Sequence, residues 1–155
     1  SMSSTTNYIS DDLRQLVATR AKHLCEYCLI HEDDTNYGCQ VDHIISLKHG
    51  GTTAPENLAY ACIFCNRHKG SDVGSILWPT QKFIRFFNPR TDLWAEHFKL
   101  DGAIIKPQTN FGKTTAQILG FNHIDRVLER QILITIGRYP TASAKERMNT
   151  ETLEE

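Results

Sequence analysis

The segments Cys25-Glu26-Tyr27-Cys28 and Cys62-Ile63-Phe64-Cys65 share one pattern, two cysteines separated by two residues. This spacing lets each segment present two thiolates to a single tetrahedral Zn2+, and four thiolates complete its coordination. The alternatives are two disulfides or four buried thiols without metal. The N-terminal residues carry no export signal, which predicts a cytoplasmic, reducing location and favours zinc. We therefore expect a structural zinc site formed by Cys25, Cys28, Cys62 and Cys65.

Length and composition narrow the class of protein. The chain has 155 residues, of which 40% are hydrophobic and 23% charged, as is typical of one globular domain. No stretch approaches the ~18 consecutive apolar residues of a membrane span, so we expect a soluble protein. The formal net charge is -1, so the composition as a whole gives no electrostatic argument for a nucleic-acid partner.

The segment between the cysteine pairs predicts a two-stranded hairpin. Residues 41–45 and 57–61 are rich in β-forming side chains and are separated by a glycine turn. After the second pair, residues 66–69 predict a short helix that ends at Gly70. Before the first pair, an N-terminal helix is expected from about residue 10 to residue 24, where Ser10 is the capping residue.

The composition also suggests how the chain is divided. We expect a core with zinc knuckles over residues 8–75 and a C-terminal extension over residues 76–139, with flexible tails at 1–7 and 140–155. Glycine, serine and proline between residues 70 and 79 mark the boundary. In the extension, Asp101-Gly102 predicts a hairpin turn. Asn122 is the expected cap of a last helix whose apolar face contains Ile124, Val127, Leu128 and Ile132.

The residues around the cysteine pairs resemble the HNH endonucleases, the ββα-metal nucleases. The resemblance covers about residues 23–72, and its motifs are Cys25-x-x-Cys28, Val41-Asp42-His43-Ile44-Ile45, Gly50-Gly51, Asn57-Leu58 and Cys62-x-x-Cys65-Asn66-x-x-Lys69-Gly70. It implies an α+β fold with a ββα core, preceded by a helix and braced by zinc. It also implies one catalytic divalent ion, Mg2+ or Mn2+, and hydrolysis of phosphodiester bonds in DNA.

The chemistry of that reaction suggests roles for the matching residues. Phosphodiester hydrolysis needs a base that activates water and a cation that stabilises the developing charge. His43 titrates near neutral pH and can be the base. Asp42, its neighbour on a strand, points to the opposite side and can hold the metal. The resemblance makes Asn66 the second metal ligand, and it makes Asn57 a residue that hydrogen-bonds backbone across the hairpin.

Two residues of the short helix have less certain roles. Lys69 shares a helix face with Asn66, so we expect it to look into the site and contact phosphate, the alternative being a solvated surface lysine. His68 lies about 200° around the helix from Asn66. It is either a further ligand of the catalytic ion or, as we prefer, a residue that faces DNA or solvent. The fifth cysteine, Cys39, is expected to be a small, half-buried residue beside a strand.

The near-zero net charge hides an uneven distribution. Residues 66–113 contain eight basic and four acidic side chains, whereas residues 140–155 contain two basic and four acidic ones. The basic region favours DNA as the partner, although the sequence does not distinguish DNA from RNA and leaves a protein partner or a homodimer open. Within it, three cations alternate with phenylalanines and either follow a phosphate backbone or edge an apolar core: Lys82, Arg85 and Arg90 with Phe83, Phe86 and Phe87.

Two other classes of function compete with a nuclease. A non-catalytic zinc-knuckle module would bind nucleic acid or protein without turnover, but it has no need of Asp42, His43 and Asn66 together. A thiol redox protein could use the paired cysteines, but no βαβ pattern surrounds them. The sequence therefore favours a metal-dependent endonuclease.

Overall fold

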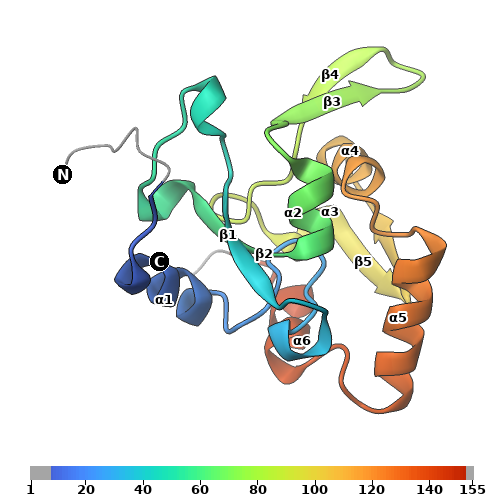
Figure 1. The fold of residues 1–155 in the computed structure, drawn as a ribbon. Coiled ribbons are helices and arrows are strands. Elements are labelled where there is room, and N and C mark those ends of the chain that lie inside the picture. The colour runs from blue at the N-terminus through green and yellow to red at the C-terminus, as the bar shows by residue number, and fades with distance from the viewer. Residues whose placement is uncertain (1–7, 153–155) are drawn as a thin grey trace.

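The computed structural model describes residues 8–152, in which helices and two-stranded hairpins combine in an α+β fold (Figure 1). Short 3-10 helices lie at Glu32–Asp34, Leu47–His49 and Pro55–Asn57. The six helices of this part of the chain are α1 (Asp11–Arg20), α2 (Ile63–Lys69), α3 (Trp94–His97), α4 (Asn110–Ile118), α5 (Ile124–Thr135) and α6 (Ala142–Asn149). Its six strands are β1 (Cys39–His43), β2 (Leu58–Cys62), β3 (Gly74–Leu77), β4 (Lys82–Arg85), β5 (Phe98–Asp101) and β6 (Ile104–Pro107).

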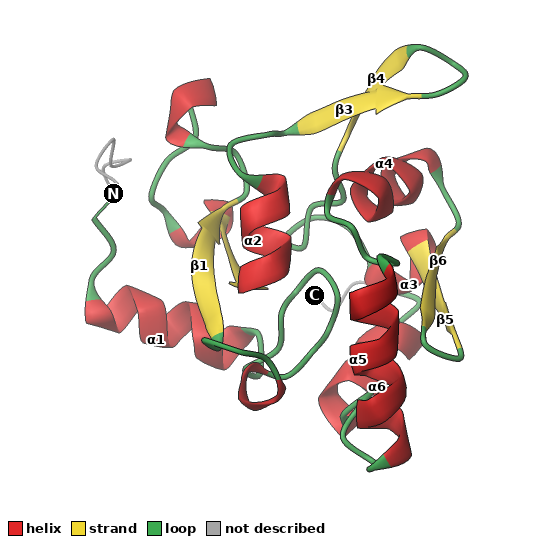
Figure 2. Ribbon diagram, turned by 45° about the vertical axis from the view of Figure 1, so that its right-hand side comes forward, coloured by secondary structure: helices red, strands yellow, loops and turns green. Residues whose placement is uncertain are grey.

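The predicted ββα unit is present. Strands β1 and β2 pair antiparallel, with Cys39 opposite Cys62 and His43 opposite Leu58. Helix α2 follows β2 directly and lies beside the hairpin (Figure 2). It ends at Gly70, which has a φ of 54° and donates its backbone N–H to the carbonyl of Asn66. The helix starts earlier than expected, so its first turn contains Cys65.

Helix α1 begins as predicted but is shorter. The Oγ of Ser10 accepts a hydrogen bond from the backbone N–H of Leu13 at 3.2 Å, the usual N-cap geometry. The helix ends at Arg20, whereas the sequence predicted residue 24. Lys22 and His23 adopt φ values of 54° and 62°, which an α-helix does not accommodate. The chain turns at these residues, and this brings Cys25 close to the β1–β2 hairpin.

The first half of the extension differs from the sequence prediction. Residues 70–79 were expected to be a boundary, but they contain β3, which pairs with β4 in a hairpin that rests on α4 and projects above the rest of the fold (Figure 1). A Cβ on Gly74 would lie 2.4 Å from the carbonyl oxygen of Ile84, so the strands need glycine at this position. The second hairpin is confirmed for β5 and β6, with Gly102 at a φ of 59° in the turn.

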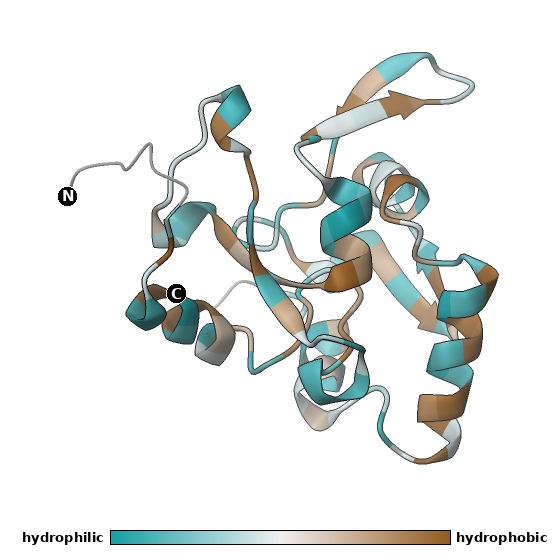
Figure 3. Cartoon of the chain, viewed as in Figure 1, coloured by the Kyte–Doolittle hydropathy of each residue, from teal (hydrophilic) through white to brown (hydrophobic). Residues whose placement is uncertain are grey.

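Helix α5 is present, but the orientation of its apolar face was wrongly predicted. Of the four predicted residues only Val127 is buried, whereas Ile124, Leu128 and Ile132 are exposed; Figure 3 shows hydrophobic segments along this helix. Arg126 and Arg130 point inward instead. The Nε of Arg130 donates to the Ala103 carbonyl at 2.7 Å, and its Nη2 donates to the Phe121 carbonyl at 2.6 Å. These buried carbonyls need donors, which an aliphatic side chain does not supply.

The C-terminal segment is also more ordered than predicted. Residues 140–155 were expected to form a flexible tail, but residues 142–149 form α6, whose Thr141 Oγ1 accepts from the N–H of Ala144 at 3.1 Å. Ala144 is fully buried, and Arg147 reaches the buried carboxylate of Glu26 at 3.2 Å. Contacts between residues so far apart in the chain cannot be predicted from the polar composition of one segment. The predicted N-terminal tail, residues 1–7, lies outside the described residues.

The extension shares its core with the ββα unit. Phe87, Trp94 and Phe98 belong to the same buried cluster as Tyr27 and the four paired cysteines. The indole N–H of Trp94 donates to the carbonyl of Tyr27 at 2.8 Å. Removal of the extension would therefore expose the apolar side of the cysteine site. Within residues 8–152, no helix combines the length and the apolar character needed to cross a membrane.

Candidate active site and metal-binding cysteines

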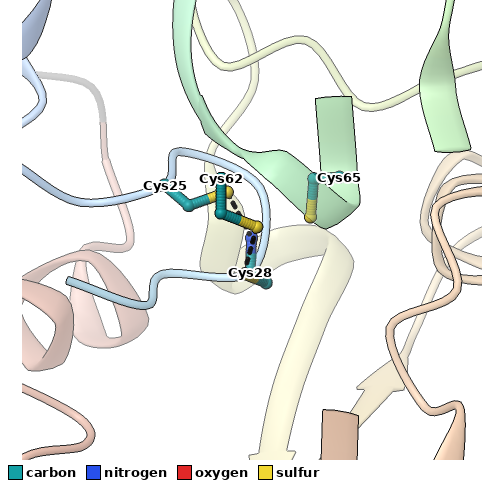
Figure 4. A group of neighbouring side chains, drawn as sticks. All are labelled: Cys25, Cys28, Cys62 and Cys65. Carbon is teal, nitrogen blue, oxygen red and sulfur yellow. Dashed lines mark hydrogen bonds between the residues drawn. The ribbon is translucent and has the colours of Figure 1, made fainter. Parts of the chain in front are cut away.

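The four paired cysteines converge on one point. Cys25 and Cys28 come from the turn after α1, and Cys62 and Cys65 come from the end of β2 and the start of α2 (Figure 4). All four are buried, and their sulfur atoms lie within 4.8 Å of one another. The Sγ atoms of Cys28 and Cys62 are 3.8 Å apart, and tetrahedral Zn–S bonds of about 2.3 Å would place sulfurs ~3.8 Å apart. The cluster can hold a metal ion, and its donor chemistry fits zinc.

Arg126 of α5 lies directly against this cluster, a contact that the sequence did not reveal. Its Nη2 is 3.1 Å from the Sγ of Cys28 and 3.6 Å from that of Cys62. Burial lowers the pKa of Arg126, but the nearby cysteine thiolates outweigh this effect and raise the pKa above its usual value. Hydrogen bonds from the other cysteines, together with the Arg126 charge, hold the pKa of the Cys28 thiol well below its usual value. The arginine thus favours the thiolate form that binds metal.

Replacement of Arg126 tests this stabilisation. We expect Arg126→Met to weaken zinc binding about tenfold, because residues that hydrogen-bond metal ligands typically contribute 10- to 100-fold to affinity. The measurement is competition for zinc against a chromophoric chelator. Arg138→Met is the matched control, since Arg138 follows the same helix but is exposed and pairs with Asp34. Equal zinc affinity in the two variants would contradict the role of Arg126.

Asp42, His43 and Asn66 line one surface pocket, together with Ser46, Lys48, Gly70, Ser71 and other neighbours. The first two residues stand at the end of β1, and Asn66 stands on α2. The structure thus brings together the three residues that the sequence predicted as base and metal ligands. Lys69 and His68 do not line this pocket.

The imidazole of His43 is held by a residue that sequence analysis missed. Its Nε2 lies 2.9 Å from the hydroxyl of Thr53, which is buried in the loop between the strands. Burial lowers the pKa of His43, although the charge of Asp42 opposes this effect. A lowered pKa keeps the imidazole uncharged at neutral pH, the form that can accept a proton. No sequence signal distinguished Thr53 from the other polar residues of its loop.

Asn57 fastens the loop that follows His43. Its Oδ1 accepts from the N–H of Ile45 at 2.9 Å, and its Nδ2 donates to the carbonyls of Ile45 and Thr52, each at 2.8 Å. These are bonds across the hairpin of the kind that the family resemblance implies. A Cβ on Gly51 would lie 1.7 Å from the Ile45 oxygen and 2.8 Å from the Asn57 amide, so only glycine fits in this turn.

Lys69 is buried beneath the site, whereas the sequence predicted a phosphate contact. Its Nζ lies 3.1 Å from Oδ2 of Asp42 and donates to the His43 carbonyl at 2.9 Å. The hydroxyl of Tyr27 donates to the same carboxylate at 3.0 Å. Burial raises the pKa of Asp42, and the Lys69 charge opposes this shift. With 2% of its surface exposed, Lys69 acts on the position and charge of Asp42.

We expect Lys69→Met to lower the free energy of unfolding by about 3–5 kcal/mol, because it leaves the buried Asp42 carboxylate without its counter-charge. Urea denaturation followed by circular dichroism measures the change. Lys48→Met is the control, since Lys48 lines the same pocket but is exposed. A Lys69→Met protein as stable as the parent would contradict the assignment of Lys69 to this buried pair.

The two remaining residues of α2 face different surroundings. Nδ2 of Asn66 donates to Oε1 of Gln40 at 2.9 Å, which turns its Oδ1 to the other side. His68 is exposed; its Nδ1 donates to the Phe64 carbonyl at 2.8 Å, and its ring lies 5.4 Å from that of His123. This geometry agrees with the preferred orientation of His68, away from Asp42 and Asn66.

The basic and aromatic residues of β4 and the loop after it have mixed roles. Phe86 and Phe87 are buried in the core. Arg85 pairs with Asp92 at 2.8 Å, and Arg90 pairs with the buried Glu26. These residues are the core and its edge, the second of the two alternatives that the sequence left open. Lys82 and Phe83, the other two residues of this basic and aromatic segment, are exposed and belong neither to the core nor to these ion pairs.

The structure thus contains an antiparallel hairpin followed by a helix, with the Asp42-His43 pair at the end of β1 and Asn66 on α2. The family model described as HNH endonuclease matches residues 25–72 and assigns this segment to that family. The chain is also similar to the Septu protein PtuB of Bacillus thuringiensis, with 28% identity over 116 residues. That alignment covers 71% of this chain and 41% of the relative. No solved structure gives a significant match.

Proposed function

We propose that this chain is a metal-dependent HNH endonuclease that hydrolyses phosphodiester bonds in DNA. The observation that carries the proposal is the single pocket lined by Asp42, His43 and Asn66. The family match at residues 25–72 supports nuclease activity independently of this geometry. The basic composition of residues 66–113 supports a nucleic-acid substrate.

His43 is the proposed general base. The hydroxyl of Thr53 orients the imidazole through its hydrogen bond with Nε2. When Thr53 accepts this hydrogen bond from Nε2–H, Nδ1 carries no proton and can remove one from water. Asn57 keeps the backbone around residue 45 in place, and this fixes the exit of β1 where His43 stands. Lys69 holds the Asp42 carboxylate and the His43 carbonyl from below. It is a positioning residue in this proposal.

The side chains of Asp42 and Asn66 fit a divalent ion. Three contacts, two from Lys69 and one from Tyr27, occupy the Asp42 carboxylate, whose two oxygens offer about four acceptor sites. Asn66 can supply its Oδ1. Mg2+ is commonly held by one or two protein oxygens plus water and substrate phosphate, so this small donor set is sufficient. The ion would supply charge stabilisation for the phosphate, and zinc would remain structural at the four cysteines.

Supercoiled plasmid provides a direct test. We expect the purified protein to convert it to nicked or linear DNA with Mg2+ or Mn2+ and to leave it intact with EDTA. Zinc content is measured in parallel, so that chelation of the catalytic ion is distinguished from loss of the structural one. Binding of DNA without metal-dependent cleavage would instead indicate a non-catalytic zinc-knuckle module and would refute the proposal.

A further inference from the structure

A second pocket lies outside the pocket of Asp42, His43 and Asn66 and shares no lining residue with it. It is lined by the tip of the β3–β4 hairpin and by α4 and the turn after it, and it has a volume of about 520 Å³. This volume is within the range of ~300–1,000 Å³ that is usual for small-molecule sites. Leu77 and Ala116 are buried in it, whereas Trp78 is 62% exposed. An exposed indole at the edge of a pocket offers a flat aromatic face on which a planar ligand can stack.

The chemistry of this lining suits a nucleic-acid base. It combines the aromatic face of Trp78 with one lysine, Lys113, the amide of Gln117 and the imidazole of His123, and it includes no carboxylate. The amide of Asn122 is already used, because it bonds both backbone groups of Ile105. An apolar wall, an aromatic face and a few polar groups at the edge are what a planar base with a hydrogen-bonding rim requires.

Two short segments of the protein link the pocket to the proposed active site. Along α2, His68 stands two residues after Asn66 and contacts His123, which lines the second pocket. Along the chain, Ser71 lines the active-site pocket and Trp78 lines the second one. Ser71 and Trp78 are seven residues apart, and at about 3.3 Å per residue the distance between them is at most ~23 Å. That distance corresponds to about seven nucleotides of a duplex strand, and fewer of an extended single strand.

We propose that the pocket between the β3–β4 hairpin and α4 binds an unpaired base of the substrate strand, with Trp78 stacked on the base. This inference rests on the proposed nuclease function and adds a substrate class, nucleic acid with single-stranded character near the cleaved bond. The exposed cations Lys82 on β4 and Arg67 on α2 belong to the elements that adjoin this part of the chain and would attract the phosphates of the same strand.

The two tryptophans of the chain make the test direct. Trp94 is buried, at 4% exposed, so a ligand in the pocket should leave its fluorescence unchanged. Quenching during a titration therefore reports on Trp78. A His43→Ala protein is titrated with a 10-nucleotide oligothymidine and with a fully paired duplex in EDTA, and intrinsic fluorescence is recorded. We expect the single strand to quench Trp78 and to protect it from iodide, and we expect the paired duplex to do so less.

Variants on the same hairpin localise the effect. Trp78→Ala in the His43→Ala background is expected to weaken single-strand binding about tenfold, measured by polarisation of a labelled oligonucleotide, and Trp78→Phe is expected to restore most of it. Phe83→Ala is the matched control, because Phe83 is a similarly exposed aromatic residue, at 59%, that does not line the pocket. It should bind like the parent.

Unchanged binding by Trp78→Ala, or an equal loss in Phe83→Ala, would overturn the inference. Circular dichroism of each variant confirms that its fold is intact. Plasmid cleavage by the otherwise unmodified protein is scored separately. Cleavage together with absent Trp78 quenching would reject the base pocket and leave the proposed nuclease function standing, whereas absence of cleavage would reject the function itself.

Discussion

Cys25→Ser is expected to yield a protein that neither holds zinc nor folds. In the parent protein the sulfur of Cys25 is one of four that lie within 4.8 Å of one another in the buried core. A serine oxygen is a poor substitute for a thiolate as a zinc ligand. Binding of structural zinc contributes about 10–16 kcal/mol in small zinc domains, whereas a whole domain is stable by only about 5–15 kcal/mol. Without the metal, three thiols and one serine hydroxyl are left buried in the core, and Arg126 contacts two of these thiols, those of Cys28 and Cys62.

The fifth cysteine provides the control for this experiment. Cys39 is half-buried, lies outside the metal-binding cluster and begins β1. Cys39→Ser should therefore retain both its zinc and its circular dichroism spectrum. Zinc content by atomic absorption and thermal unfolding are measured on both variants. A folded, metal-free Cys25→Ser protein would show that the cysteines are not a structural zinc site.

His43→Ala is expected to abolish metal-dependent cleavage while the protein remains folded and loaded with zinc. Loss of a general base typically lowers the rate by 10²- to 10⁴-fold. The side chain is only half-buried and its hydrogen bond is to a single hydroxyl, so its removal costs little stability. Initial rates of plasmid nicking with Mg2+, combined with the unfolding midpoint and the zinc content, separate the loss of chemistry from the loss of structure.

The matched control for His43→Ala is His49→Ala. His49 is exposed at the end of a short 3-10 helix close to the site, and it does not line the pocket of Asp42, His43 and Asn66. We expect its cleavage rate to match that of the parent. If His43→Ala retained full activity, the base would have to be another group and the proposed mechanism would fail.

The burial of Lys69 on α2 shows what the spacing of residues along a helix can and cannot predict. Helical spacing predicted that Lys69 looks into the site with Asn66, but spacing carries no information on depth, and Lys69 lies buried against Asp42 outside the pocket that Asn66 lines. The short α2 packs against β1, so its last turn brings Lys69 to the Asp42 carboxylate, which Tyr27 also contacts. A side chain at that depth needs a counter-charge, and the Asp42 carboxylate supplies it. Position on a helix face was predictable, and the partner was not.

The extension illustrates the same limit on a larger scale. A local composition rich in Gly, Ser and Pro predicted a boundary where β3 and β4 form a hairpin. The apolar stripe of α5 predicted a core face, yet the buried side of that helix carries Arg126 and Arg130. In both cases the deciding contacts join residues far apart in the chain: the hairpin rests on α4, and Arg126 meets Cys28 across 98 positions.

By itself, the sequence predicted the cysteine pairs and the ββα order, and its resemblance to the HNH endonucleases predicted roles for Asp42, His43, Asn57 and Asn66. These features depend on short spacings, because chelation by two-residue loops, strand alternation and helix termination at glycine are local properties of the backbone. Only the tertiary structure decided that Lys69 is buried, that Thr53 orients His43, that Arg126 lies against the thiolates and that Trp78 borders a second pocket. Those outcomes depend on which distant segments satisfy each buried charge and polar group, and no local pattern encodes that choice.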